Sequence, residues 1–197
     1  MSEKAAAWLA VVASEKGVIS KEDIDLYKYS YQILIERTTS WLCILIVASL
    51  FGTLQPYALV FATFFVPLSM FNGGGHASGF GICFAVSVGI FLGFSIAEPF
   101  ITERLSTNVM MGIIVCCSIL IGFSGPSANP NKPMDIKSIT RCHKISIAIL
   151  FIEVLVAFVV FTLGNERVLM FIVFSFVIVG VSLLAAHCTA KKILKKY

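Results

Sequence analysis

Four long apolar runs dominate the chain from residue 80 onward. Residues 80–97 and 168–188 contain no charged residue, and residues 145–163 contain only Glu153. A helix that crosses the hydrocarbon core of a membrane needs about 20 apolar residues, with a range of roughly 17 to 25. Each of the three runs therefore predicts a transmembrane helix. The fourth run, residues 108–123, is slightly shorter than this range, but it carries no charge and predicts a fourth transmembrane helix.

The apolar stretch 41–71 is too long for one membrane helix and is interrupted by Gln55 and Pro56. We interpret it as two short spans, 41–54 and 57–71, joined by a tight turn. An earlier start of the first span is an alternative, because residues 31–35 are already apolar and only Glu36 and Arg37 interrupt the pattern. The whole pattern predicts an all-α, polytopic membrane bundle of about six transmembrane helices, with residues 1–197 forming a single membrane-embedded domain.

The first 35 residues mix apolar and charged positions, which is typical of one or two amphipathic helices. Ser20 and Asp23 have the spacing of a helix start, where the Ser side chain accepts a hydrogen bond from a free backbone N–H. These N-terminal helices either lie in the membrane interface or pack on the spans as ordinary cytoplasmic helices. The pattern does not distinguish the two.

Basic residues predict the orientation of the bundle. With six spans, residues 1–40, 72–79, 124–144 and 189–197 lie on one side, and they hold 13 of the 15 Lys and Arg residues. The other side receives only Arg104 and Arg167. Because positively charged loops stay in the cytoplasm, we expect a multi-pass protein of the cell membrane with both termini cytoplasmic.

Composition agrees with a membrane protein. Hydrophobic residues make up 58% of the chain and charged residues 13%, against about 25% charged residues in soluble domains. The six cysteines form no CxxC pair and lie mostly in apolar runs or beside basic residues, so we expect free thiols. We expect the lipid bilayer as a partner and no nucleic acid, and a homodimer is an alternative that the sequence leaves open.

One segment combines glycines with a histidine and a cysteine. His76 and Cys83 are seven residues apart, which on a straight helix is a rise of about 10.5 Å, too far for a base to reach its nucleophile. Glycines at 73–75, 79 and 81 permit a sharp reversal before the next span begins. In that geometry the imidazole and the helix N-terminus favour a thiolate at Cys83. The alternative is a flexible loop with a solvated His76 and a lipid-facing Cys83.

Several other features of the sequence indicate a function less specifically. One His and one Cys are too few for a zinc site, and we expect neither a metal nor another cofactor. The proline-rich loop 125–133 is either a substrate platform or a linker between spans. Glu153 is expensive in lipid, so we expect it to face the bundle interior. A structural pairing with an Asn, Ser or Lys is one role open to it there, and a gating or proton-linked role is the alternative. Neighbouring Cys142 and His143 cannot readily share a helix face, so we expect ordinary structural roles for them.

Three stretches, taken together, resemble the accessory gene regulator B (AgrB) family, membrane cysteine endopeptidases of Gram-positive quorum sensing. They are Asp25-Leu-Tyr-Lys-Tyr29 before the first span, Gly74-Gly-His-Ala77 followed by Cys83, and Gly125-Pro126 with Asn131-Lys-Pro133 after the fourth span. There are two departures. The Arg that the family usually has six or seven residues before the histidine is missing from the segment Leu68-Ser69-Met70, and Ser30 stands where a glycine is common.

The resemblance implies a function. Such enzymes remove the C-terminal tail of a small AgrD-like peptide precursor and yield a cyclic thiolactone intermediate. Cys83 would be the nucleophile and His76 the base. No third catalytic residue is identified, and Asn72, Ser78 and Asn129 are candidates. We assign substrate binding to residues beside the catalytic pair and in the proline-rich loop: Asn72, Gly74, Gly75, Pro126, Asn131, Lys132 and Pro133.

Two functions of other classes compete with this hypothesis. In a small transporter or channel, Glu153 would be the coupling residue and Cys83 incidental. In a membrane scaffold, neither residue would have a chemical role. Thiol reactivity distinguishes the three functions. Only the enzyme is expected to have one cysteine of low pKa that bound substrate protects from thiol reagents.

Overall fold

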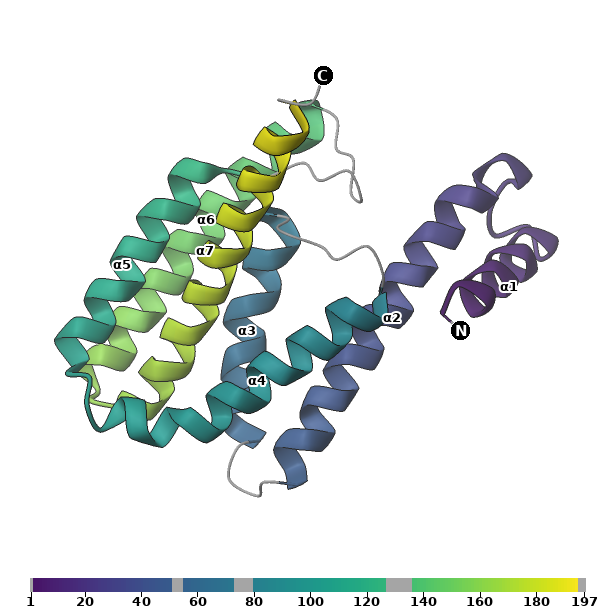
Figure 1. The fold of residues 1–197 in the computed structure, drawn as a ribbon. Coiled ribbons are helices and arrows are strands. Elements are labelled where there is room, and N and C mark those ends of the chain that lie inside the picture. The colour runs from purple at the N-terminus through teal and green to yellow at the C-terminus, as the bar shows by residue number, and fades with distance from the viewer. Residues whose placement is uncertain (1, 51–54, 73–79, 127–135, 195–197) are drawn as a thin grey trace.

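The computed structural model describes residues 2–50, 55–72, 80–126 and 136–194, and these segments are helical apart from short connections. The described residues form no β-strand. Seven α-helices and one short 3-10 helix follow one another along the chain (Figure 1). They are α1 (Ser2–Glu15), η1 (Lys21–Asp23), α2 (Ile24–Leu50), α3 (Gln55–Asn72), α4 (Phe80–Thr102), α5 (Thr107–Ser124), α6 (Ile136–Thr162) and α7 (Glu166–Leu194).

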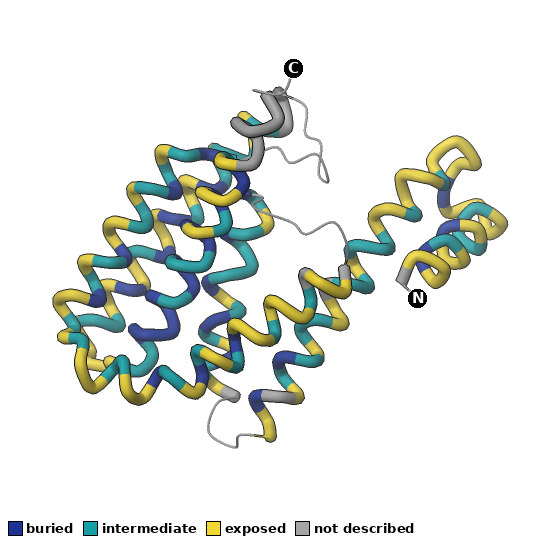
Figure 2. Tube along the Cα trace, viewed as in Figure 1, coloured by how far each residue is buried: buried dark blue, intermediate teal, exposed yellow. Residues whose placement is uncertain are grey.

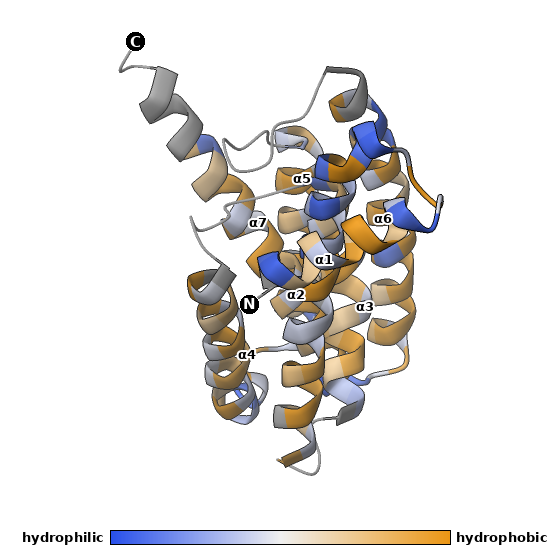
Figure 3. Ribbon diagram, turned by 90° about the vertical axis from the view of Figure 1, so that its right-hand side faces the viewer, coloured by the Kyte–Doolittle hydropathy of each residue, from blue (hydrophilic) through white to orange (hydrophobic). Residues whose placement is uncertain are grey.

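The predicted helical membrane bundle is confirmed. Five helical segments are long and apolar enough to cross a membrane, and a sixth apolar segment, Pro56–Asn72, is shorter than these. Figure 3 shows apolar residues along most of the length of the long helices. Pro56 lies in the first turn of α3, where its missing N–H costs no helical hydrogen bond. That explains why the apolar stretch breaks there.

The first span begins earlier than residue 41, as the alternative interpretation has it. Helix α2 runs without a break from Ile24 through Glu36 to Leu50. The Gln32 amide donates to the Glu36 carboxylate over 3.0 Å, one helical turn along. Glu36 and Arg37 therefore mark no helix boundary.

Helices α3, α5, α6 and α7 pack side by side around the main hydrophobic core, and α2 and α4 lie obliquely against them (Figure 1). In the spanning part of α7, 56% of the residues are buried, against 12% to 22% in the four other candidate spans. Figure 2 shows this concentration of buried residues. A second cluster joins α2 and α4 to α3 and α7 through aromatic contacts such as the stacked rings of Phe94 and Phe174. Helix α7 is therefore the central element on which the others pack.

Helix α1 packs on the first half of α2, beside the rest of the bundle (Figure 1). Ala6 and Ala10 are buried in this contact, and Lys28 forms an ion pair with Glu3 at 3.2 Å. The predicted helix start at Ser20 is confirmed, because Ser20 directly precedes η1, but the predicted hydrogen bond of its side chain is wrong. Its hydroxyl donates to the Asp23 carboxylate at 2.7 Å and accepts no backbone hydrogen bond. The Asp23 carboxylate accepts this hydrogen bond, a charge-assisted one, from the Ser20 hydroxyl.

Candidate functional site

The predicted catalytic cysteine lies at the start of a helix. The backbone of Cys83 belongs to the first turn of α4, which begins at Phe80. The free N–H groups of a helix N-terminus carry a partial positive charge, and such a position favours a thiolate. His76, Gly74 and Gly75 lie outside the described residues. The approach of the imidazole to the thiol therefore stays a prediction.

The remaining predicted site residues lie at or near the ends of α3 and α5. Asn72 is the last residue of α3, and Pro126 comes directly after the Gly125 that caps α5. Asn131, Lys132 and Pro133 lie outside the described residues, as do the two further candidates Ser78 and Asn129. The described parts of α3, α5 and α6 meet at this end of the bundle (Figure 1).

Asn72 is fully buried and faces α6. Its side-chain amide donates to the Leu68 carbonyl at 2.9 Å, one turn back along α3. Its side-chain oxygen accepts a hydrogen bond of 2.8 Å from the hydroxyl of Ser146, which is also buried. The Asn72 side chain thus joins the end of α3 to the buried Ser146 in the third turn of α6. Sequence reasoning singled out Asn72 but gave no signal for Ser146.

His143 lies against the end of α5. Gly125 has a positive φ of 63°, and a Cβ at this position would come within 3.3 Å of His143 Nδ1. That nitrogen is buried and has no hydrogen-bond partner among the residues that the structure describes. The positive φ favours glycine here, and a Cβ would also be in tight contact with the imidazole. His143 and Ser146 are three residues apart, so α6 contacts the ends of both α5 and α3 with one face.

Glu153 faces the bundle interior, which confirms that prediction. Only 7% of the residue is exposed. Pairing with an Asn, Ser or Lys was one structural role open to it, but neither of its buried carboxylate oxygens has a hydrogen-bond partner among the described residues. Ser146, on the same face of α6 and two turns earlier, is instead hydrogen-bonded to Asn72.

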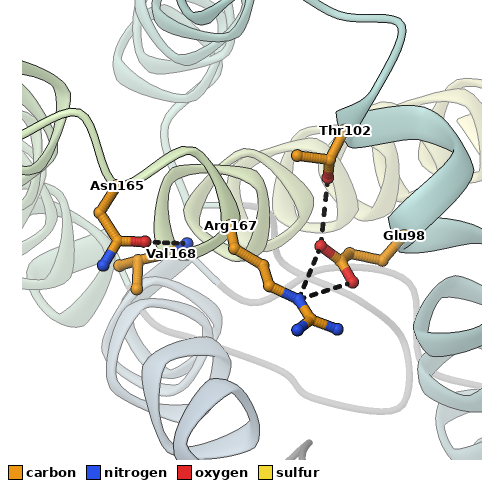
Figure 4. Close-up of polar contacts among 5 residues, drawn as sticks. All are labelled: Glu98, Thr102, Asn165, Arg167 and Val168. Atoms are coloured by element: carbon orange, nitrogen blue, oxygen red, sulfur yellow. Dashed lines mark hydrogen bonds and ion pairs between the residues drawn. The ribbon is translucent and has the colours of Figure 1, made fainter.

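A polar cluster at the opposite end of the bundle escaped sequence reasoning (Figure 4). Glu98, only 1% exposed, accepts hydrogen bonds from Arg167 Nε at 3.1 and 3.2 Å and from the Thr102 hydroxyl at 3.1 Å. The Arg167 guanidinium also lies 4.9 Å from the centre of the Tyr57 ring. Two features of the sequence could have indicated this cluster. Glu98 directly follows the apolar run 80–97, and Arg167 is one of the two basic residues on the predicted non-cytoplasmic side.

No three His, Cys, Asp or Glu side chains in the described ranges lie close enough to hold a metal ion. Among known proteins, the family model Accessory gene regulator B matches residues 3–183 of the chain. No curated protein and no solved structure matches. The family match includes the segment with His76 and Cys83, the proline-rich loop and the described ends of α3, α5 and α6.

Proposed function

The chain belongs to the accessory gene regulator B (AgrB) family of quorum-sensing membrane proteins, and we propose that it is a membrane cysteine endopeptidase. It cleaves the C-terminal tail from an AgrD-like peptide precursor and yields a cyclic thiolactone. The observation that supports this proposal most is the place of Cys83 in the first turn of α4, seven residues after His76, inside the matched region. A thiol at a helix N-terminus beside an imidazole is suited to nucleophilic attack.

The reaction has two acyl transfers. The Cys83 thiolate attacks the scissile carbonyl carbon, the peptide bond to the tail breaks, and His76 gives its proton to the departing amine. The precursor is then held as a thioester on Cys83. The precursor's own cysteine thiol attacks this thioester, His76 takes its proton, and Cys83 leaves as a thiolate. The product is a thiolactone, provided that water is kept from the thioester, because hydrolysis would give a linear peptide instead.

Substrate binding is proposed for the ends of α3 and α5 and the segments that follow them. Asn72, Gly74 and Gly75 flank His76, and Pro126, Asn131, Lys132 and Pro133 belong to the proline-rich loop. Arg141 and Lys144 are exposed at the start of α6, beside the end of α5. Their charge favours an acidic precursor tail.

The orientation belongs to the same proposal, because the precursor is made in the cytoplasm and must reach Cys83. Both termini and the basic segments are placed on the cytoplasmic side by the positive-inside rule. Cysteines introduced at Ser2 and Lys196 are expected to react with an impermeant thiol reagent only from the cytoplasmic side, and one at Glu103 only from outside. Labelling of either terminus from outside contradicts this orientation.

The function is tested by co-expressing the protein with precursors encoded beside its gene and identifying the peptide products by mass spectrometry. Cys83→Ala is expected to abolish cleavage while membrane insertion and precursor binding persist, and Cys83→Ser to retain at most trace activity. His76→Ala is expected to slow cleavage by orders of magnitude and to raise the pKa of the Cys83 thiol, because the imidazolium partner is lost. As controls, single Ala substitutions at Cys43, Cys116, Cys117, Cys142 and Cys188 should change little. Cleavage without Cys83 contradicts the proposal.

A further inference from the structure

The hydrogen bond between Ser146 and Asn72 differs from the bonds of five other helical serines, and Ser175, which also reaches α3, bonds to the Phe61 carbonyl as well as within its own helix. Ser30, Ser40, Ser49, Ser95 and Ser118 each donate to the carbonyl four residues earlier in their own helix. This local bond is the usual one for serine inside a helix. The hydroxyl of Ser146 instead donates across to α3, to a residue 74 positions away. The bond is therefore a specific connection between two helices.

The Asn72 side chain has one orientation that satisfies both of its neighbours. Its NH₂ group donates to the Leu68 carbonyl, so its oxygen must face α6 and accept from Ser146. Asn72 is 0% exposed and Ser146 is 1% exposed, so water cannot replace either partner. Removal of the Ser146 hydroxyl leaves the buried Asn72 amide oxygen without a donor. Because an unsatisfied buried acceptor costs free energy, we expect the end of α3 to shift.

The place of Asn72 in the sequence makes this connection matter for the active site. Only Gly73, Gly74 and Gly75 separate it from His76. Glycines have no side chain that can pack and have wide backbone freedom. Asn72 is therefore the last residue before His76 whose side chain can fix the chain. Four residues reach at most about 14 Å, so the position of Asn72 also limits where the imidazole can lie.

We propose that Ser146 is a positioning residue for the His76 side of the catalytic site: it holds Asn72, and with it the point from which the His76 segment leaves α3. This inference rests on the proposed function, since it assigns a role relative to His76 and Cys83. The competing interpretation is a hydrogen bond that only stabilises the bundle. Hydrogen bonds between membrane helices contribute little to stability on average, so the two interpretations predict different ratios of rate loss to stability loss.

The experiment compares Ser146→Ala with Ser146→Thr and with the control Ser95→Ala, in full-length protein with its precursor. Ser95 is buried like Ser146, but its hydroxyl bonds only within its own helix. Ser146→Ala is expected to lower kcat about 10- to 100-fold with KM changed less than about twofold, because a misplaced base slows the chemical step. Its melting temperature should fall by no more than about 3 °C. Ser146→Thr, which keeps the hydroxyl, should retain most of kcat, and Ser95→Ala nearly all of it.

A second readout does not depend on cleavage. In a variant whose other five cysteines are Ala, the rate of Cys83 alkylation against pH reports the thiol pKa. Ser146→Ala and Asn72→Ala should each move this profile in the direction of His76→Ala, and the double variant Asn72→Ala/Ser146→Ala should move it no further than the larger single change. The inference is overturned if Ser146→Ala leaves both kcat and the profile unchanged, or if Ser95→Ala has the same effect. The proposed function itself fails on a different result: cleavage that survives Cys83→Ala, or a profile that His76→Ala does not move.

Discussion

Two glutamates are buried in this bundle, and their surroundings are opposite. Glu98 lies near the end of α4 and accepts hydrogen bonds from Arg167 and Thr102. Glu153 lies in the middle of α6, and neither of its carboxylate oxygens has a hydrogen-bond partner in the described part of the chain. Figure 4 shows how the Arg167 side chain reaches Glu98 from α7. Burial is almost the same at the two sites, so the partners account for the difference.

The comparison teaches which buried polar groups stabilise this bundle and which do not. A buried carboxylate costs free energy unless hydrogen bonds and an opposite charge compensate it. Glu98 has both, and its pair with Arg167 joins α4 to the central helix α7 at the end opposite Cys83. Glu153 has neither, so the bundle tolerates it at a cost. Removal of the Glu98 carboxylate is therefore expected to lower the stability of the bundle, and removal of the Glu153 carboxylate to raise it.

The largest effect is expected from Arg167→Ala. It leaves Glu98 buried without its cation, and breaking such a pair typically costs 3–5 kcal/mol. Because Arg167 is 40% exposed, water screens the pair, and we expect about 2–4 kcal/mol. The measurement is unfolding in a mild detergent, followed by the fluorescence of the two tryptophans. Arg104→Ala, an exposed arginine on the same side, is the control and should change stability by less than about 0.5 kcal/mol. Equal losses at both positions would contradict the role of the pair.

Next in size is Glu153→Leu, with the opposite sign. Replacing an unpaired buried carboxylate by an apolar side chain of similar size is expected to stabilise the bundle by about 1–3 kcal/mol. Glu98→Leu, the matched substitution, should destabilise it, because Arg167 and Thr102 lose their acceptor. The same unfolding assay measures both variants. A loss of stability in Glu153→Leu would show that this carboxyl has a stabilising partner.

A smaller effect is expected from Thr102→Val, which keeps the shape of the side chain and removes one of the hydrogen bonds to Glu98. Hydrogen bonds of this kind in membrane proteins contribute about 0.6 kcal/mol on average, and we expect a loss of that order. Thr63→Val is the control, because the Thr63 hydroxyl donates only to the Leu59 carbonyl within α3. If the two variants unfold alike, Thr102 adds nothing to the Glu98 cluster.

The smallest effect is expected from Glu153→Gln. The amide has the same shape and is equally without a partner, so the change in stability should stay within about 0.5 kcal/mol. Precursor cleavage should persist at the wild-type rate. This variant also separates the proposed peptidase from a proton-coupled transporter, because Gln cannot carry a proton as a coupling carboxyl does. Loss of cleavage in Glu153→Gln, at unchanged stability, would favour a chemical role for this residue.

The sequence by itself determined the class of fold. In lipid, each backbone polar group must be satisfied within its own helix, so long apolar runs predict membrane helices reliably. A charged side chain is also costly in lipid, and this cost predicted that Glu153 faces the bundle interior. The start of the first span was less certain from sequence, because Glu36 and Arg37 look like an interruption. In the structure, α2 continues without a break through both charged residues.

Only the tertiary structure decided which polar groups meet. Glu98 and Arg167 are 69 residues apart, and Asn72 and Ser146 are 74 apart. These pairings depend on how α3, α4, α6 and α7 pack, and no local pattern encodes them. The same holds for the lack of a partner at Glu153 and for the imidazole of His143 against Gly125. Hydropathy is a property of each segment and can be read along the chain, whereas a hydrogen bond between helices requires their relative position and rotation.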